Sequence, residues 1–169
     1  MVPSNQLPEE ALFEMSTQHY VPLRRSLSPV DLENNSKLTA PRPKPRVIVA
    51  DDHHAMLEEM SRLLKGDFEV VAAVTNGALA VQNVADLKPD AVVLDIHMPG
   101  MDGIEAARNL MRLGSSAKII FLTIEIDPEY VELATTMGVS YVVKTRLYHD
   151  LIIAIKEALA GRLFVSSLM

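Results

Sequence analysis

Apolar residues from Arg46 onward occur in two alternating patterns. Short runs rich in valine and isoleucine are typical of buried strands, and longer stretches with apolar residues three and four positions apart predict helices. The predicted strands are 46–50, 68–74, 91–96, 118–123 and 140–144. The predicted helices are 54–66, 78–87, 103–113, one that opens at 127–128, and 149–161. Five strands alternating with five helices predict an α/β fold, a doubly wound parallel sheet with helices on both faces.

Residues 1–45 do not follow this pattern. Seven of the ten prolines lie before residue 46, and the segment APRPKP favours extended backbone. We therefore predict a flexible N-terminal extension over 1–45, one domain over 46–165 and a short C-terminal end over 166–169. The alternative for the extension is a docking segment at 7–15, where the apolar residues share one face of a helix.

Composition excludes several classes of function. The formal net charge is −6 at pH 7, which argues against a surface that binds nucleic acid directly. Cysteine is absent, so disulfides, thiolate catalysis and cysteine-based zinc sites are excluded. Apolar runs are too short to span a membrane, and the N-terminus lacks the pattern of a secretion signal. The expected location is the cytoplasm.

Polar residues stand where the predicted strands end. Asp51 and Asp52 follow the first strand, Asp95 lies at the end of the third, and the fourth and fifth end at Thr123 and Lys144. In an open α/β sheet, ligands bind beyond the carboxyl ends of the strands. If the strand order is 2-1-3-4-5, the first and third strands are neighbours, and three carboxylates meet a hydroxyl and an ammonium in one crevice.

This set of groups predicts chemistry on phosphorus. Carboxylates held close together repel each other, and a divalent cation offsets that repulsion. Oxygen ligands favour Mg²⁺, which is bound through one or two carboxylates together with a phosphate. Lys144 and Thr123 can then contact phosphoryl oxygens while one carboxylate acts as a nucleophile.

Each candidate also has an ordinary structural interpretation. The aspartates can be helix caps or turn residues, Thr123 and Tyr141 can be strand packing, and Lys144 can be a solvated surface charge. A zinc or iron site is a further alternative, because histidine is a frequent metal ligand. The histidines concerned are His53, His54 and His97. Against it, the convergent ligands are hard oxygens, which favour Mg²⁺.

Four segments, VADDHHAML, VVLDIHMPGMDG, FLT and YVVK, occur in this order. Together they resemble the receiver domain of two-component response regulators, most like receivers of the NarL/FixJ type. The resemblance covers about residues 46–165 and implies the flavodoxin-like, CheY-like strand order 2-1-3-4-5. It also implies that Asp95 is the phosphate acceptor, fixed by its strand yet accessible to a donor. Mg²⁺ would be held directly by Asp52 and Asp95, mostly through water by Asp51, and by the backbone carbonyl of His97.

The resemblance assigns the remaining site residues as well. Thr123 and Lys144 would bind the phosphoryl group, and Thr123 with Tyr141 would form the switch, Tyr141 turning inward on phosphorylation. Two residues depart from the family pattern. Thr145 follows Lys144 where many receivers have proline, so the loop that carries Lys144 can sit differently. Ile124 follows Thr123 where many have a small residue, which predicts restricted access and slower phosphoryl exchange.

The function implied is a phosphorylation-activated signalling switch. The phosphoryl donor would be a histidine kinase or a phosphotransfer protein of a bacterial two-component system. An output partner would read the face formed by the fourth helix, the fifth strand and the last helix. A homodimer through that face, or through the first and last helices, would also fit. The chain is not expected to be a multiple-turnover enzyme or to contact a membrane.

Three alternatives stay open. The final stretch resembles regulators that carry a C-terminal DNA-binding domain, for which no room is left before Met169, so the chain is either a stand-alone receiver or the receiver half of a transcription factor. A Mg²⁺-dependent phosphohydrolase with Asp95 as nucleophile is the alternative from another class. A scaffold with a vestigial site is the third.

Overall fold

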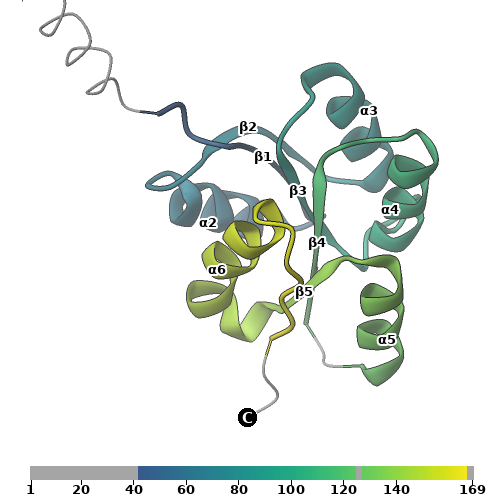
Figure 1. Cartoon of the computed structure of the whole chain (residues 1–169). Helices are drawn as coiled ribbons and strands as arrows, with labels where there is room; N and C mark the ends of the chain where they lie inside the picture. Colours follow the sequence, from purple (N-terminus) through teal and green to yellow (C-terminus); the bar gives the residue numbers. More distant parts are fainter. Residues whose placement is uncertain (1–41, 125–126, 167–169) are drawn as a thin grey trace, which may run out of the picture. The chain divides into compact units, whose positions relative to one another are not determined.

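The structure is a computed structural model that describes residues 42–124 and 127–166 (Figure 1). The chain divides into two units, 1–42 and 43–169, and the fold described below is that of the second. The sequence predictions for 1–41, including the docking segment at 7–15, lie outside the described residues, as does the chain after residue 166.

The core of the second unit is one parallel sheet of five strands in the order β2-β1-β3-β4-β5. This order confirms the fold that the resemblance implied. It places β1 and β3 side by side at the centre, with the register Val47 opposite Ala91. The strands are β1 (Arg46–Ala50), β2 (Glu69–Val74), β3 (Ala91–Asp95), β4 (Lys118–Thr123) and β5 (Ser140–Val143).

Helices cover both faces of the sheet (Figure 1). On β1, Val47 and Val49 face the layer of α2 and α6, whereas Ile48 and Ala50 face the layer of α3, α4 and α5. Successive strand side chains point to opposite faces, so a strand buried on both sides is apolar at every position. The helices are α2 (His54–Leu64), α3 (Gly77–Leu87), α4 (Gly103–Arg112), α5 (Pro128–Met137) and α6 (Leu147–Leu159).

The structure differs from the prediction at the end of β5. The strand ends at Val143, and Lys144–Arg146 form a 3₁₀ turn, η2, that leads directly into α6. The last helix therefore starts at Leu147, two residues before the predicted start. Apolar periodicity alone did not reveal this, because the turn residues are polar.

The segment that follows α6 returns to the sheet. Val165 forms a parallel bridge with Tyr141 of β5. The backbone nitrogen of Tyr141 donates to the carbonyl of Phe164 at 2.8 Å, and that of Ser166 donates to the carbonyl of Tyr141 at 2.8 Å. Residues 162–166, called the return segment below, thus extend the sheet beyond β5.

None of the helices in the described part of the chain has both the length and the apolar character that a bilayer span requires.

Candidate functional site

Three charged groups meet where β1, β3 and β5 end. The Nζ atom of Lys144 lies 2.7 Å from Oδ2 of Asp51 and 2.9 Å from Oδ2 of Asp95. Both carboxylates are buried. The neighbouring positions of β1 and β3 in the sheet bring the two aspartates together, and η2 brings the lysine across from β5. The predicted convergence of these three residues is what the structure shows.

Asp52 lies at the outer side of this group. Its side chain is 31% exposed, and its Oδ1 lies 2.8 Å from Nδ1 of His53. The same ring nitrogen lies 3.4 Å from Oδ1 of Asp51, and the backbone nitrogen of His53 donates to that oxygen at 2.9 Å. Sequence reasoning did not place His53 in the phosphoryl site. Its position directly after the two aspartates was the only available signal.

Asp95 is less accessible than the sequence suggested. It is only 3% exposed, and its Oδ2 is paired with Nζ of Lys144. The backbone of Asp95 is also closely packed against Gly103, because a Cβ atom on Gly103 would lie 2.1 Å from the carbonyl oxygen of Asp95. Gly103 is therefore required where the chain turns from β3 into α4. Asp95 is fixed, as predicted, but it is not openly exposed.

The electrostatics of this group follow from its burial. Burial raises the pKa of Asp95 above its ordinary value, and the hydrogen bond from Lys144 offsets only part of that effect. Burial lowers the pKa of Lys144, but its contacts with Asp51 and Asp95 outweigh burial and raise the pKa overall. Lys144 therefore stays an ammonium, and one positive charge serves two carboxylates.

Thr123 and Tyr141 lie on the next two strands. Thr123 follows Leu122, the β-bridge partner of Asp95, so it lies one position beyond Asp95 on the neighbouring strand. Tyr141 is fully buried. Burial raises its pKa, and hydrogen bonds with the backbone of Asp127 and the side chain of Thr123 offset part of that rise. The two predicted switch residues are thus in contact, and Tyr141 is already inside the core.

The side chain of His97 points away from the buried charges. It is exposed, and its ring packs edge-on against Tyr130 of α5 with centroids 5.7 Å apart. Only its backbone nitrogen contacts the site, at 3.4 Å from Oδ1 of Asp95. A role for its side chain as a metal ligand is therefore not needed.

The donor set fits a hard divalent cation. One buried oxygen, Oδ1 of Asp52, has no hydrogen-bond partner among the described residues, although Nδ1 of His53 lies 2.8 Å away. Oδ2 of Asp51 is paired with the ammonium of Lys144 at 2.7 Å. A buried carboxylate oxygen without a hydrogen-bond partner is costly, and a cation would satisfy it. Among the described residues, the atoms close enough to share one ion come from Asp51, Asp52 and His53. Asp95 is joined to this group through Lys144.

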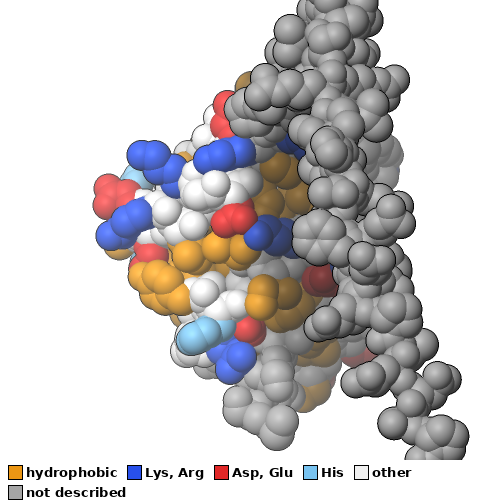
Figure 2. Space-filling model, turned by 60° about the vertical axis from the view of Figure 1, so that its left-hand side comes forward, with side chains coloured by type: hydrophobic (Ala, Val, Ile, Leu, Met, Phe, Trp, Pro, Cys, Tyr) orange, Lys and Arg blue, Asp and Glu red, His pale blue; other side chains and the backbone are white. Residues whose placement is uncertain are grey.

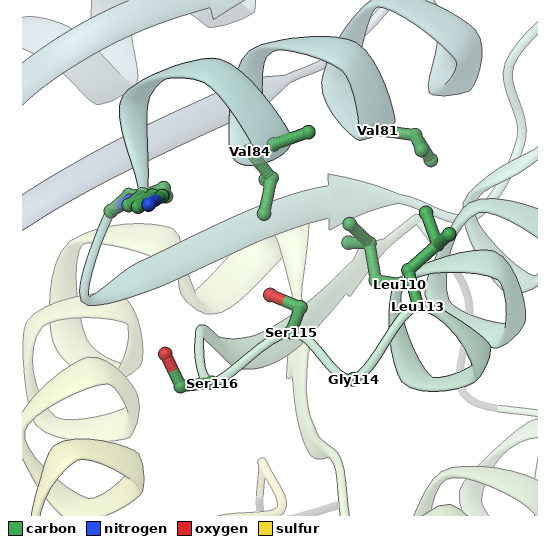
Figure 3. A pocket seen from close by; sticks show the side chains of 10 residues that line it. Val81, Val84, Leu110, Leu113, Gly114, Ser115 and Ser116 are labelled. Carbon is green, nitrogen blue, oxygen red and sulfur yellow. The ribbon is translucent and has the colours of Figure 1, made fainter.

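The domain has two surface hollows of interest, and one of them adjoins the site. One, of about 460 Å³, lies beside Lys144 and is lined by Ile124, Met56 and Thr145 among others. The other, of about 240 Å³, lies between the ends of α3 and α4 and is lined by apolar side chains such as Val84 and Leu110 (Figure 3). It is bounded by residues that precede β3 and β4, so it is at the opposite edge of the sheet from Asp95.

The face shown in Figure 2 carries basic and acidic side chains interspersed with apolar ones. A surface that binds a nucleic acid backbone gathers basic side chains instead. On this face there is no such gathering among the side chains that the structure describes.

A parallel sheet in this order, with acidic residues at the carboxyl ends of its strands and a lysine directly after β5, is the architecture of a response regulator receiver. Residues 47–156 match the response regulator receiver domain family, and the chain belongs to that family.

Particular relatives support the assignment. The transcriptional regulatory protein DegU of Brevibacillus brevis is 34% identical over 125 residues, which cover 72% of this chain and 53% of DegU. The transcriptional regulatory protein LiaR of Bacillus subtilis is 35% identical over 119 residues, 69% of this chain and 56% of LiaR. The receiver domain of the response regulator NarL from Mycobacterium tuberculosis superposes with a TM-score of 0.66 at 28% identity, covering 71% of this chain and 99% of that domain. The chain spans little more than half the length of the two regulators.

Proposed function

We propose that this receiver is switched by phosphorylation of Asp95. A carboxylate oxygen of Asp95 would attack the phosphorus of a kinase or phosphotransfer-protein phosphohistidine. The new oxygen–phosphorus bond forms as the phosphorus–nitrogen bond breaks, and the imidazole leaves with its electron pair. The observation that carries the proposal is the Lys144 ammonium, held within 3 Å of two buried carboxylates from neighbouring strands. A cation in that place can follow the phosphoryl oxygens as negative charge develops on them.

Mg²⁺ is the cofactor that we assign to the site. When bound, it supplies charge neutralisation for the phosphoryl group. Asp52, whose buried Oδ1 has no hydrogen-bond partner among the described residues, would hold it directly together with Asp95, and Asp51 would hold it mostly through water. The backbone carbonyl of His97 remains the proposed additional ligand.

Thr123 and Tyr141 are the residues proposed to transmit phosphorylation of Asp95 to the surface of the domain. The Thr123 hydroxyl would donate to a phosphoryl oxygen, and Tyr141 would follow through its hydrogen bond with Thr123. Because Tyr141 is already buried, phosphorylation would stabilise this inward position rather than create it. The surface formed by α5, β5 and α6 would then populate mainly one conformation.

The downstream partner is proposed from the relatives. DegU and LiaR are transcriptional regulators about twice as long as the matched region. We infer that this receiver controls a partner of that class, either as a separate chain or as the receiver half of a longer one. A homodimer would use the α5, β5 and α6 face or the α2 and α6 face. Because bacterial response regulators typically act in the cytoplasm, we extend that location to this chain.

The test is phosphorylation with acetyl phosphate and Mg²⁺, followed by intact mass. We expect one added phosphoryl group on the wild type and none on Asp95→Asn, because the nucleophile is lost. Asp102→Asn is the matched control, since Asp102 is exposed and its capping role suits asparagine too. Sustained turnover of small phosphate esters would instead favour the hydrolase alternative. Label on wild type and Asp95→Asn alike would refute Asp95 as the acceptor.

A further inference from the structure

A third buried carboxylate lies in the domain, outside the group of Asp51, Asp95 and Lys144. Asp150, in the first turn of α6, is 4% exposed. Its Oδ2 accepts hydrogen bonds from Nε of Arg146 at 2.8 Å and from Oγ of Ser166 at 2.6 Å, and its Oδ1 accepts from Nη2 of Arg146 at 3.3 Å. A carboxylate is buried in this way only when its oxygens are satisfied. These hydrogen bonds therefore hold Arg146 and Ser166 in place beside Asp150.

The three residues come from three different parts of the chain. Arg146 ends the η2 turn, Asp150 belongs to α6, and Ser166 ends the return segment. Ser166 is 2% exposed, and its Oγ also accepts a hydrogen bond from the backbone nitrogen of Val143 at 3.2 Å. One buried hydroxyl thus joins the return segment both to β5 and to α6.

These contacts enclose Lys144. Val143 precedes it and is bonded to Ser166, and Arg146 follows two residues later and is bonded to Asp150. Ser166 and Asp150 are bonded to each other. The backbone that carries Lys144 is therefore held on both sides by a single Ser166–Asp150 pair, 16 residues apart in sequence.

We propose that Asp150 and Ser166 are positioning residues for Lys144, and that docking of the return segment on β5 is coupled to phosphorylation of Asp95. The inference rests on the proposed function of Asp95. Among the described hydrogen bonds, Asp150 and Ser166 make none to Asp95. They fix the turn from which the Lys144 ammonium reaches Asp51 and Asp95. Linkage is reciprocal, so a change at the phosphoryl site also changes how firmly the return segment is held.

The return segment has a second serine contact that supplies a control. Oγ of Ser140 accepts a hydrogen bond from the backbone nitrogen of Phe164 at 3.1 Å. Ser140 is buried like Ser166 but lies at the start of β5, four residues before Lys144. Ser140→Ala removes a hydroxyl that holds the same segment without touching the Lys144 turn.

The experiment measures two quantities on the full chain: amide exchange by NMR, and the rate and final extent of Asp95 labelling by acetyl phosphate. We expect Ser166→Ala and Asp150→Asn to speed exchange of the Val143 amide about tenfold, because its acceptor is lost or loosened. We expect both to slow labelling about tenfold, because Lys144 is displaced. The final extent of labelling and the Mg²⁺ concentration for half-maximal rate should not change, since Asp51 and Asp52 stay in place.

Two controls separate positioning from general loosening. Ser140→Ala should speed exchange of the Phe164 amide and leave the labelling rate as in the wild type. Asp67→Asn breaks an exposed ion pair to Lys156 of α6 by the same chemical change as Asp150→Asn, and it should alter neither quantity.

The outcomes are distinct. Wild-type labelling rates in both Ser166→Ala and Asp150→Asn, or unchanged exchange at Val143, would overturn the inference and leave the proposed function standing. A fall in the final extent of labelling at an unchanged rate would also overturn it, because that result indicates partial unfolding. No label on the wild type would overturn the proposed function first, and the coupling with it.

Discussion

The domain contains two buried groups of acidic side chains. They differ in the positive charges and hydrogen-bond donors that offset their negative charge. At the carboxyl edge of the sheet, Lys144 alone serves both Asp51 and Asp95, and burial leaves the pKa of Asp95 raised. At the return segment, burial acts to raise the pKa of Asp150, but hydrogen bonds from Arg146 and Ser166 outweigh it and lower the pKa.

The difference separates the proposed reactive centre from a structural one. Asp95 and its neighbours lack one positive charge, so a divalent cation improves their balance, and phosphorylation, which adds negative charge, increases the need for that cation. Asp150 has its donors already, so its ionised form contributes to the folded state. Aspartate is thus the proposed phosphate acceptor in one place and a structural anchor in the other.

The largest expected effect on stability is at Lys144. Lys144→Met leaves two buried carboxylates unpaired, and we expect a loss of about 3–5 kcal/mol in the free energy of unfolding without Mg²⁺. Lys156→Met breaks the exposed pair with Asp67 and should cost about 0–1 kcal/mol. Urea unfolding of the three proteins measures both. Equal losses in the two variants would contradict the contrast between a buried and an exposed lysine.

Mg²⁺ tests whether the reactive centre is short of positive charge. At a hundredfold excess over its Kd, the ion should stabilise the wild type by about 2.7 kcal/mol. Asp52→Asn should lose most of this gain, because it removes a charged ligand, while Asp102→Asn should keep it. Thermal unfolding with and without Mg²⁺ provides the measurement. A gain that persists in Asp52→Asn would remove Asp52 from the proposed ligand set.

Acid titration tests the structural centre. The pKa of Asp150 is lowered in the folded chain, so its contribution to stability is present above the ordinary aspartate value of 3.8 and is lost as the pH falls through the folded value. The difference in unfolding free energy between wild type and Asp150→Asn should therefore shrink on acidification below about pH 4. Ser166→Ala keeps the carboxylate but removes one donor, and it should reduce this pH dependence without abolishing it. If the difference in unfolding free energy between wild type and Asp150→Asn grew on acidification, the lowered pKa assigned to Asp150 would be wrong.

The smallest expected effect is at the entrance to the reactive centre. Ile124 is 60% exposed and lines the same hollow as Lys144, and the sequence predicts that its bulk restricts the approach to Asp95. We expect Ile124→Ala to speed loss of the phosphoryl group a few-fold, measured as the decay of labelled protein after the donor is removed. Ile153→Ala removes a comparably exposed isoleucine from α6 and should not change the decay. Identical decay in all three proteins would contradict the idea that Ile124 limits access.

Much of the fold could be predicted from the sequence, because every strand of this sheet is short, apolar and flanked by an amphipathic helix. The site could be predicted for the same reason, since parallel strands bring their carboxyl ends to one edge. Asp51, Asp95 and Lys144 were identified in this way, and the structure brings them together.

Other features carried no periodic signal. The η2 turn is three polar residues, and nothing in Lys144–Arg146 distinguishes it from the end of a strand. Asp150 and Ser166 are single polar residues in ordinary positions, and only the return of the chain to β5 joins them. The burial of Asp95 depends on how far the Lys144 side chain reaches, which a linear pattern does not contain.

The return segment also affects how other chains can approach. A strand at the rim of a sheet offers its backbone to any extended peptide, and such rims are sites of unwanted association. At Tyr141 that backbone is already engaged on its outer side by Phe164 and Ser166 of the same molecule. A protein that recognises this rim must therefore meet helix surfaces and the outside of the added segment, and it can recruit β5 by strand addition only after displacing residues 162–166.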